Sequence, residues 1–464
     1  MTDAARAPRS LRALATSPAL WVAVLTLATY TLYAWLDWRR YRTSSYDLGI
    51  FTQAVAQYAA GRPPVASIKG EDFNLLGEHF HPILALLAPL FWVAPSPFTL
   101  QVAQVVLVAA SAVVVTVVAE RVLGRGAAWC VGLAYALSWG VQQAVASQFH
   151  EVAFAAPLLA LAAGAIVLRH WRTAAVAAGL LVFVKEDLGL TVAALALVLG
   201  WRSGRWLLAS GLAVWGIGWS LLAMRVVMPA LAGGHWRFTS DIAAHPLLAL
   251  AGALGEPAKA TTLGLVLVAS GLVGLRSPLM LVVLPTLLWR FVSTNPHHWG
   301  PGFHYNLVLM PLAFLAIVDA LALLRPAGSR SRDARGHWTR WVPAAVLAAA
   351  VGVLVLVPNQ PLMALAKPTT WQAPRAESAA RVLALVPDDA VVASDHALID
   401  RLALRTQVYF LGVDGPTPDW VLIDARAGGV PRDAEVAAYA SALYPGTRWN
   451  VVTSEDGYQL ARRV

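Results

Sequence analysis

Acidic, basic and histidine side chains of this 464-residue chain gather in short segments between long apolar runs. A carboxylate beside a hydroxyl group accepts its proton or holds a metal ion, and histidine can do either. Lysine and arginine bind phosphate, lysine as a point charge and arginine through its planar fork. The segments are Tyr46-Asp47-Leu48-Gly49-Ile50-Phe51, Glu78-His79-Phe80-His81-Pro82, Gln148-Phe149-His150-Glu151, Lys185-Glu186-Asp187, Arg290, and Asn295-Pro296-His297-His298-Trp299 with His304-Tyr305.

The composition places these segments in a membrane protein. Hydrophobic residues make up 58% of the chain and charged residues only 13%, about half of the roughly 25% typical of soluble proteins. Cys130 is the only cysteine, which excludes an internal disulfide and a cysteine-based metal cluster. The net charge of +9 comes mostly from arginine, which indicates positive cytoplasmic loops rather than a nucleic-acid partner.

About eleven apolar runs are long enough, or nearly so, to span a bilayer. Residues 173–184 and 188–200 are either two half-length spans or one long kinked helix. His81 to Trp92 is too short to span, and we expect it to lie flat on the outer surface. The runs lie near 18–36, 98–119, 127–145, 152–168, 173–184, 188–200, 206–228, 260–275, 278–293, 306–324 and 341–358.

Arginine placement orients these spans. Arg6, Arg9 and Arg12 predict a cytoplasmic N-terminus, which puts the loop at 37–97 outside. The basic segments at 120–125, 169–172, 201–205 and 325–340 then all fall inside, and the cluster at 39–42 is the one that disagrees. On this count the polar segments lie outside, as does the C-terminal part of the chain.

The sequence pattern changes after Pro358, from long apolar runs to short ones. Residues 390–394, 407–411 and 420–424 read as buried strands, and 375–386 and 432–443 as helices. No phosphate-binding loop of the G-x-G-x-x-G type is present. We therefore expect a transmembrane domain over 1–358 and a small extracytoplasmic α/β domain over 359–464 that carries no catalytic residue.

Each polar residue also has a purely structural interpretation. Asp47 stands before an apolar helical run and could be its N-cap. Lys185, Glu186 and Asp187 could form a solvated turn with internal pairing, and His297 and His298 an interfacial loop. As a set, however, the histidine and acid clusters lie mostly outside whereas the inner loops are rich in arginine, and charges near a bilayer mark functional sites.

The motifs Asp47-Leu48-Gly49-Ile50-Phe51, His79-Phe80-His81-Pro82, Phe149-His150-Glu151 and Lys185-Glu186-Asp187 resemble those of the bacterial membrane proteins of domain-of-unknown-function family 2079. The layout is also distantly similar to the GT-C glycosyltransferases. Those enzymes keep a carboxylate early in a long first external loop, a second polar site between helices three and four, and often a lysine between helices five and six. Many members carry an acidic pair where this chain has Asp47 alone.

The resemblance implies an all-α polytopic GT-C-like bundle that transfers a sugar from a polyprenyl-phosphate donor to an envelope acceptor. Transfer would occur on the outer face of a bacterial cytoplasmic membrane, with membrane lipid and the lipid-linked donor as partners. Asp47 would be the base or a metal ligand, with His150 and Glu151 as further catalytic residues. Substrate contacts would come from Lys185, Glu186, Asp187, Arg290, His304, Tyr305, His79 and His81, with Lys185 and Arg290 on phosphate.

Two questions stay open at this stage. His150, Glu151 and His304 could complete a divalent-metal site, which would suit magnesium or manganese, with histidine favouring zinc, or they could orient the acceptor. The alternative to an enzyme is a non-enzymatic membrane protein, either a transporter or an envelope assembly factor. A transporter should show internal repeats and polar groups at the bilayer midplane, and the sequence shows neither clearly.

Overall fold

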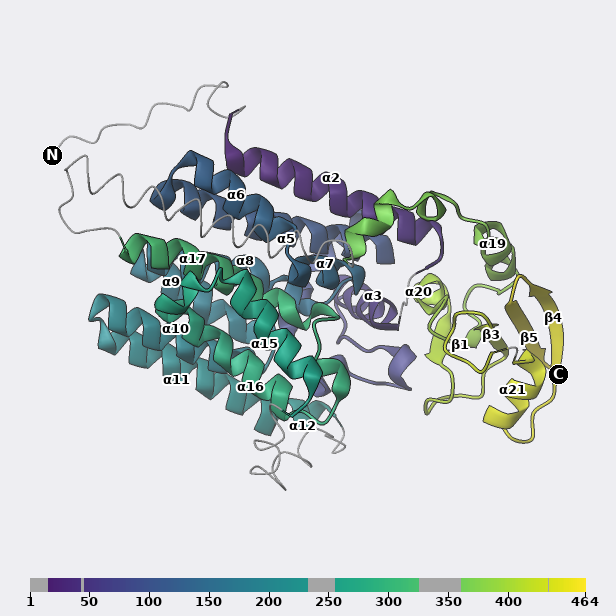
Figure 1. The fold of residues 1–464 in the computed structure, drawn as a ribbon. Coiled ribbons are helices and arrows are strands. Elements are labelled where there is room, and N and C mark those ends of the chain that lie inside the picture. Colours follow the sequence, from purple (N-terminus) through teal and green to yellow (C-terminus); the bar gives the residue numbers. More distant parts are fainter. Residues whose placement is uncertain (1–15, 43–45, 233–254, 325–359, 433) are drawn as a thin grey trace.

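The computed structural model describes residues 16–42, 46–232, 255–324, 360–432 and 434–464. Figure 1 shows two lobes, a long helical bundle and a small sheet domain that covers one end of it. The expected span at 341–358, the basic segment at 325–340 and the N-terminal arginines lie outside the described residues.

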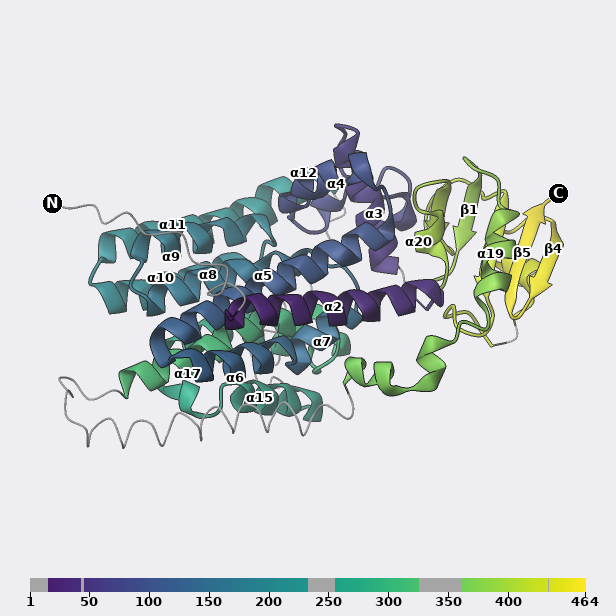
Figure 2. The same cartoon turned by 90° about the horizontal axis from the view of Figure 1, so that it is seen from above.

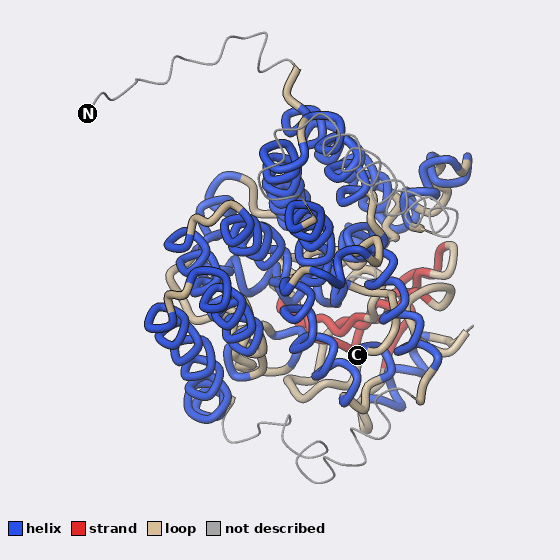
Figure 3. The backbone as a smooth tube through the Cα atoms, turned by 60° about the vertical axis from the view of Figure 1, so that its left-hand side comes forward, coloured by secondary structure: helices blue, strands red, loops and turns tan. Residues whose placement is uncertain are grey.

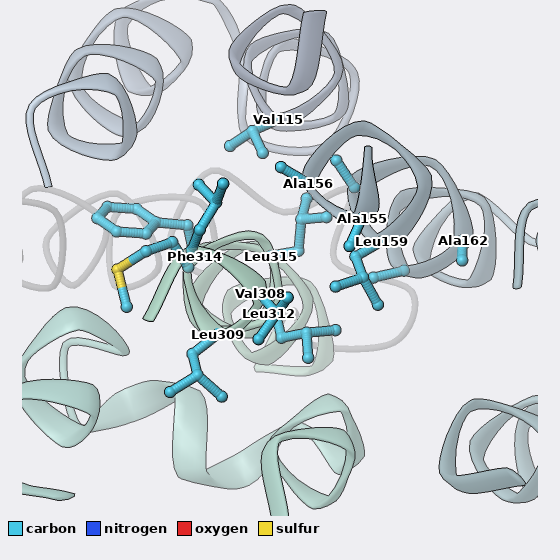
Figure 4. Close-up of a cluster of buried hydrophobic side chains, with 14 of the residues drawn as sticks. Val115, Ala155, Ala156, Leu159, Ala162, Val308, Leu309, Leu312, Phe314 and Leu315 are labelled. Carbon is cyan, nitrogen blue, oxygen red and sulfur yellow. The ribbon is translucent and has the colours of Figure 1, made fainter. Parts of the chain in front are cut away.

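The bundle is built from apolar helices that run along its length (Figures 1 and 2). Its centre is α17 (Met310–Leu323), where every residue from Met310 to Leu321 is buried. Figure 4 shows α17 and the preceding turn packed against α5 and the small residues Ala155 and Ala156 of α8, which let the helices approach closely. The other helices are α2 (Pro18–Arg39), α5 (Pro97–Leu123), α6 (Arg125–Ala136), α7 (Trp139–Ala146), α8 (Ala155–Val167), α9 (Trp171–Gly179), α10 (Leu188–Ser203), α11 (Trp206–Leu222), α12 (Met228–Leu231), α15 (Pro257–Ala269) and α16 (Leu284–Val292).

Four helical segments of the described chain are long and apolar enough to cross a membrane: 18–39, 97–123, 206–231 and 304–323. Six more apolar segments are shorter, at 10–17 residues. The predicted span at 127–145 is broken at Leu137 and Ser138 into α6 and α7. The prediction of about eleven transmembrane helices is therefore not confirmed, although helices occupy all ten predicted runs that fall within the described residues.

The basic loops and the polar segments lie at opposite ends of the bundle. The turns between α5 and α6 and between α10 and α11 lie at the end far from the sheet domain (Figure 2). There Arg202 pairs with Asp319, which also accepts a hydrogen bond from Ser277. The separation agrees with the predicted topology, whereas the assignment of one end to the cytoplasm stays a prediction.

The loop after α2 folds into short helices on the sheet-domain end of the bundle. These are α3 (Tyr46–Ala59), η1 (Ser67–Lys69), η2 (Leu75–Gly77), η3 (Pro82–Leu87) and α4 (Ala88–Val93). Leu86, Trp92 and Val93 are 68%, 70% and 87% exposed. An apolar face of this kind on a short helix fits the predicted position at a membrane interface.

The C-terminal domain holds a five-stranded sheet in the order β2-β1-β3-β5-β4. The parallel strands β1 (Val391–Ser394), β2 (Gln407–Phe410) and β3 (Trp420–Asp424) confirm the three predicted strands. The hairpin of β4 (Trp449–Glu455) and β5 (Tyr458–Arg463), which adds antiparallel to β3, was not predicted. Helices α19 (Ala376–Ala384), α20 (Ile399–Leu402) and α21 (Val436–Leu443) accompany the sheet, whose strands are red in Figure 3.

Candidate functional site

Asp47 lies at the junction of the two lobes, in the first turn of α3. The next eight residues of this helix, 48–55, are all buried, whereas the Asp47 side chain is 55% exposed. Because Asp47 is inside the helix and its carboxylate contacts His150, the alternative that it is only an N-cap does not hold. The carboxylate is both anchored and accessible, as a group that meets a substrate must be.

His150 holds this carboxylate from the loop before α8. Its Nε2 lies 3.3 Å from Asp47 Oδ2, and its Nδ1 lies 3.1 Å from the carbonyl oxygen of Gln148. The backbone N–H of His150 donates to Gln104 Oε1 at 2.9 Å, which fixes the loop against α5. Burial raises the pKa of Asp47, but His150 and the charge of Lys69 more than reverse this, so the pKa is lowered and Asp47 is a carboxylate.

Lys185 and Glu151 form a buried ion pair beside this contact. The ammonium donates to Glu151 Oε1 at 2.8 Å, and the two side chains are 12% and 3% exposed. Burial opposes the charged form of Lys185, but the carboxylates of Glu151, Asp187 and Glu186 outweigh it and raise the pKa. The predicted catalytic residue Glu151 and the predicted phosphate contact Lys185 are thus paired with each other.

The neighbours of Lys185 turn to other segments. Glu186 accepts from the backbone N–H of Phe80 at 2.8 Å and lies 2.8 Å from His79 Nδ1. Burial opposes ionisation of Glu186, but His79 lowers its pKa to about 2. Burial raises the pKa of Asp187 to about 6. The three residues form no solvated turn with internal pairing, because each of the two ion pairs joins a different part of the chain.

Three more predicted residues complete the cluster. His304 stacks on His150 with ring centroids 3.6 Å apart, and the ring centroids of His304 and Tyr305 are 4.1 Å apart. His81 is 2% exposed, edge-on to the Phe51 ring, and burial lowers its pKa to about 4. The Nδ1 atoms of His81 and His304 are buried without a hydrogen-bond partner among the described residues. The centre of the cluster therefore keeps two polar atoms unused.

Arg290 lies apart from this centre and holds a loop. It is fully buried, and its guanidinium donates to the carbonyls of His298 and Gly300 and to Asn306 Oδ1 at 2.7–2.8 Å. The Tyr305 ring is 5.8 Å from the guanidinium carbon. The geometry gives Arg290 a positioning role for the 293–306 loop, and direct contact with phosphate stays a prediction.

Sequence reasoning assigned no role to three contributors. Gln104 is a polar residue within an apolar span, which is itself a signal of function. Lys69 and Glu78 form an ion pair in the first loop, with Nζ 2.5 Å from the carboxylate, and Lys69 helps to keep Asp47 ionised. Lys69 is one of only four lysines in the chain, and that scarcity was the available clue.

The cluster does not fit the divalent-metal site that the sequence left open as one of two alternatives. In the described part of the chain, no three histidine, cysteine or acidic side chains are arranged to share a metal ion. Glu151 is engaged by Lys185, and Asp47 Oδ2 faces the ring nitrogen of His150 rather than a shared centre with it. The chemistry below is therefore derived from the side chains alone.

Comparison with solved structures identifies the fold. ArnT from Cupriavidus metallidurans bound to undecaprenyl phosphate is 14% identical, with a TM-score of 0.55 over 95% of this chain and 97% of that chain. Its apo state gives a TM-score of 0.51 over 89% and 92% at the same identity. The archaeal oligosaccharyltransferase AglB from Archaeoglobus fulgidus, solved with an inhibitory peptide and a dolichol-phosphate, gives 0.43 at 11% identity over 96% and 74%.

The likeness to ArnT shows a GT-C-like fold for this chain. No curated protein matches it significantly. The family model of the predicted membrane proteins designated DUF2079 matches residues 39–460. Because this match covers most of the chain, the protein belongs to that family.

Proposed function

We propose that the protein is a glycosyltransferase that moves a sugar from a polyprenyl-phosphate donor to an envelope acceptor at the outer face of a bacterial cytoplasmic membrane. The observation that carries the proposal is the convergence of Asp47, His150, Glu151, Lys185 and His304. They come from four separate segments and meet at one end of an apolar bundle. The ArnT fold, solved with undecaprenyl phosphate, supports a lipid-linked donor.

In this reaction the acceptor hydroxyl gives its proton to the Asp47 carboxylate while its oxygen bonds to the anomeric carbon. The bond between that carbon and the phosphate oxygen breaks, and its electron pair leaves with the phosphate. His150 orients Asp47 and keeps it ionised, which a base requires. Lys185 supplies positive charge for the departing phosphate, because its ammonium has three donors and Glu151 uses one of them.

Asp47→Asn is the test, because asparagine keeps the shape of the side chain and removes the proton acceptor. We expect at least a hundredfold loss of transfer from a lipid-linked donor in vitro, in line with the 10²–10⁴-fold value of a general base. The matched control is Asp72→Asn in the same loop. Asp72 is exposed and has a positive φ of 52°, a conformation that asparagine adopts readily.

Membrane abundance and thermal stability of both variants are measured alongside activity. Full activity in Asp47→Asn at normal abundance would remove the base role and favour a transporter or assembly factor. Lys185→Ala should instead raise the KM for the donor, because the phosphate loses a charge-assisted contact.

A further inference from the structure

The carboxyl ends of the parallel strands in the C-terminal sheet face the helical bundle. Strands β2 and β3 lie on opposite sides of β1, so the chain leaves β1 at the point where the strand order reverses. In open α/β sheets this edge is where ligands bind. Here the loop after β1 and the end of β2 meet α3, and the backbone of Asp400 lies within 4 Å of the Cβ position of Gly49.

Three aromatic rings meet at this edge of the sheet, and one of them belongs to the residue that precedes Asp47 in the sequence. Tyr46 precedes Asp47 in α3, and its ring contacts His396 at a centroid distance of 5.5 Å and Phe410 at 4.9 Å. The His396 and Phe410 rings are 4.6 Å apart. All three residues are only partly buried, so the cluster of Tyr46, His396 and Phe410 is not fully enclosed by the protein.

His396 is also within electrostatic reach of Asp47. Burial lowers the pKa of His396, and the Asp47 carboxylate acts in the opposite direction. Gly429 leaves room beside this ring, because a Cβ there would lie 3.0 Å from His396 Cδ2 and its φ is +83°. The glycine therefore keeps a loop of the sheet domain close to the imidazole without a side chain in between.

We propose that Tyr46, His396 and Phe410 form the acceptor subsite of the protein, and that they bind a sugar ring of a carbohydrate acceptor by stacking. The inference rests on the proposed transfer reaction and adds the class of its acceptor. A sugar ring has an apolar C–H face that packs on an aromatic ring and hydroxyl groups at its rim. Stacked on these rings, it lies at the first turn of α3, where Asp47 also stands.

This placement gives the C-terminal domain a function in substrate binding. A polyprenyl donor reaches the bundle from the surrounding lipid, whereas a polar acceptor approaches from water. The sheet domain lies against the end of the bundle that carries α3, the helix in which Asp47 stands (Figure 1). Acceptor and donor thus reach the carboxylate from different lobes.

The test measures transfer by the full-length protein while acceptor and donor concentrations are varied separately. The acceptor probe is the end-labelled envelope glycan fraction of a strain that lacks the protein. We expect His396→Ala and Phe410→Ala to raise the acceptor KM about fivefold, within the range that an aromatic contact of 0.5–1.5 kcal/mol implies. kcat and donor KM should change less than about twofold, and His396→Phe should restore the acceptor KM.

The matched control is Tyr439→Ala, a partly buried aromatic residue on α21 of the same domain. An unchanged acceptor KM in His396→Ala, or an equal rise in Tyr439→Ala, would overturn the subsite. Binding of the labelled glycans to Asp47→Asn separates the two proposals. If glycan binding depends on His396 but the parent protein transfers no sugar, the subsite proposal holds and the transferase proposal fails. If the parent protein transfers sugar but His396→Ala and Phe410→Ala leave the acceptor KM unchanged, the transferase proposal holds and the subsite proposal fails.

Discussion

Removal of one partner from the Lys185–Glu151 ion pair should destabilise the bundle, and removal of both should restore part of the loss. The joined atoms are 2.8 Å apart and both side chains are nearly inaccessible. At an effective dielectric constant of 20, two unit charges at that distance attract by about 6 kcal/mol, before the cost of taking both from water. Since the remaining charge would be buried and unpaired, we expect Lys185→Met and Glu151→Met each to cost about 3–5 kcal/mol.

A double-mutant cycle measures the coupling directly. Unfolding of the two single variants and the double variant in mixed micelles should give a coupling of at least about 2 kcal/mol, with the double variant more stable than either single one. The control cycle uses Arg463 and Asp419, an ion pair whose side chains are 38% and 50% exposed. Exposed pairs of this kind couple by about 0–1 kcal/mol.

The result that would refute this reasoning is a coupling no larger than that of the exposed control. In that case Glu151 does not neutralise Lys185, and the lysine is held for another group. The donor KM of the same variants then identifies that group. If the lysine is reserved for phosphate, its removal should raise the donor KM without lowering the stability of the protein.

Three further predictions concern the surroundings of the site. Burial and Lys185 lower the pKa of His79, but Glu186 outweighs them and raises it, while that of Glu186 falls to about 2. Their pair should therefore stabilise most between pH 4.5 and 6.5, so the unfolding-temperature difference between parent and Glu186→Gln should peak there and shrink as the pH rises further. Arg290→Lys should cost about 2–3 kcal/mol in unfolding assays, because a lysine cannot reach all three acceptors and leaves carbonyls unpaired; an unchanged stability would contradict this. Arg401→Ala should speed proteolysis between the lobes, since the guanidinium lies 3.1 Å above the Trp38 ring; equal cleavage rates would refute it.

The sequence indicated several residues that gather at the candidate site but not how they pair. Asp47, His150, Lys185 and Glu186 stand in segments whose polarity is costly near lipid, so their types alone marked them. The sequence could not indicate that Lys185 pairs with Glu151 and Glu186 with His79, because these contacts depend on how distant loops fold together. The metal site stays unconfirmed for the same reason. A metal ion needs several side chains around one point, and the residue types alone do not show whether they surround one.

The fold was predictable where the sequence contains long or continuous apolar runs. The three parallel strands have continuous apolar runs, as strands covered on both faces do. The β4–β5 hairpin was missed because Trp449 to Glu455 carries mixed polar residues, and its ladder depends on pairing with β3. The break at Leu137 and Ser138 was missed because the run at 127–145 is apolar on either side of it.

The two lobes share one hydrophobic core at the proposed site. Ile50 and Ala54 of α3 and Ile68 of η1 belong to the same buried cluster as Val408 and Leu422 of the sheet. The Ser67 hydroxyl donates to the carbonyl of Val408 at 2.8 Å, while Gln53 binds both Ser67 and the backbone of Ile68. Since α3 is fixed by both lobes, the position of the carboxylate at its first turn depends on the docking of the C-terminal domain. The C-terminal domain thereby helps to position the residue that we propose as the base.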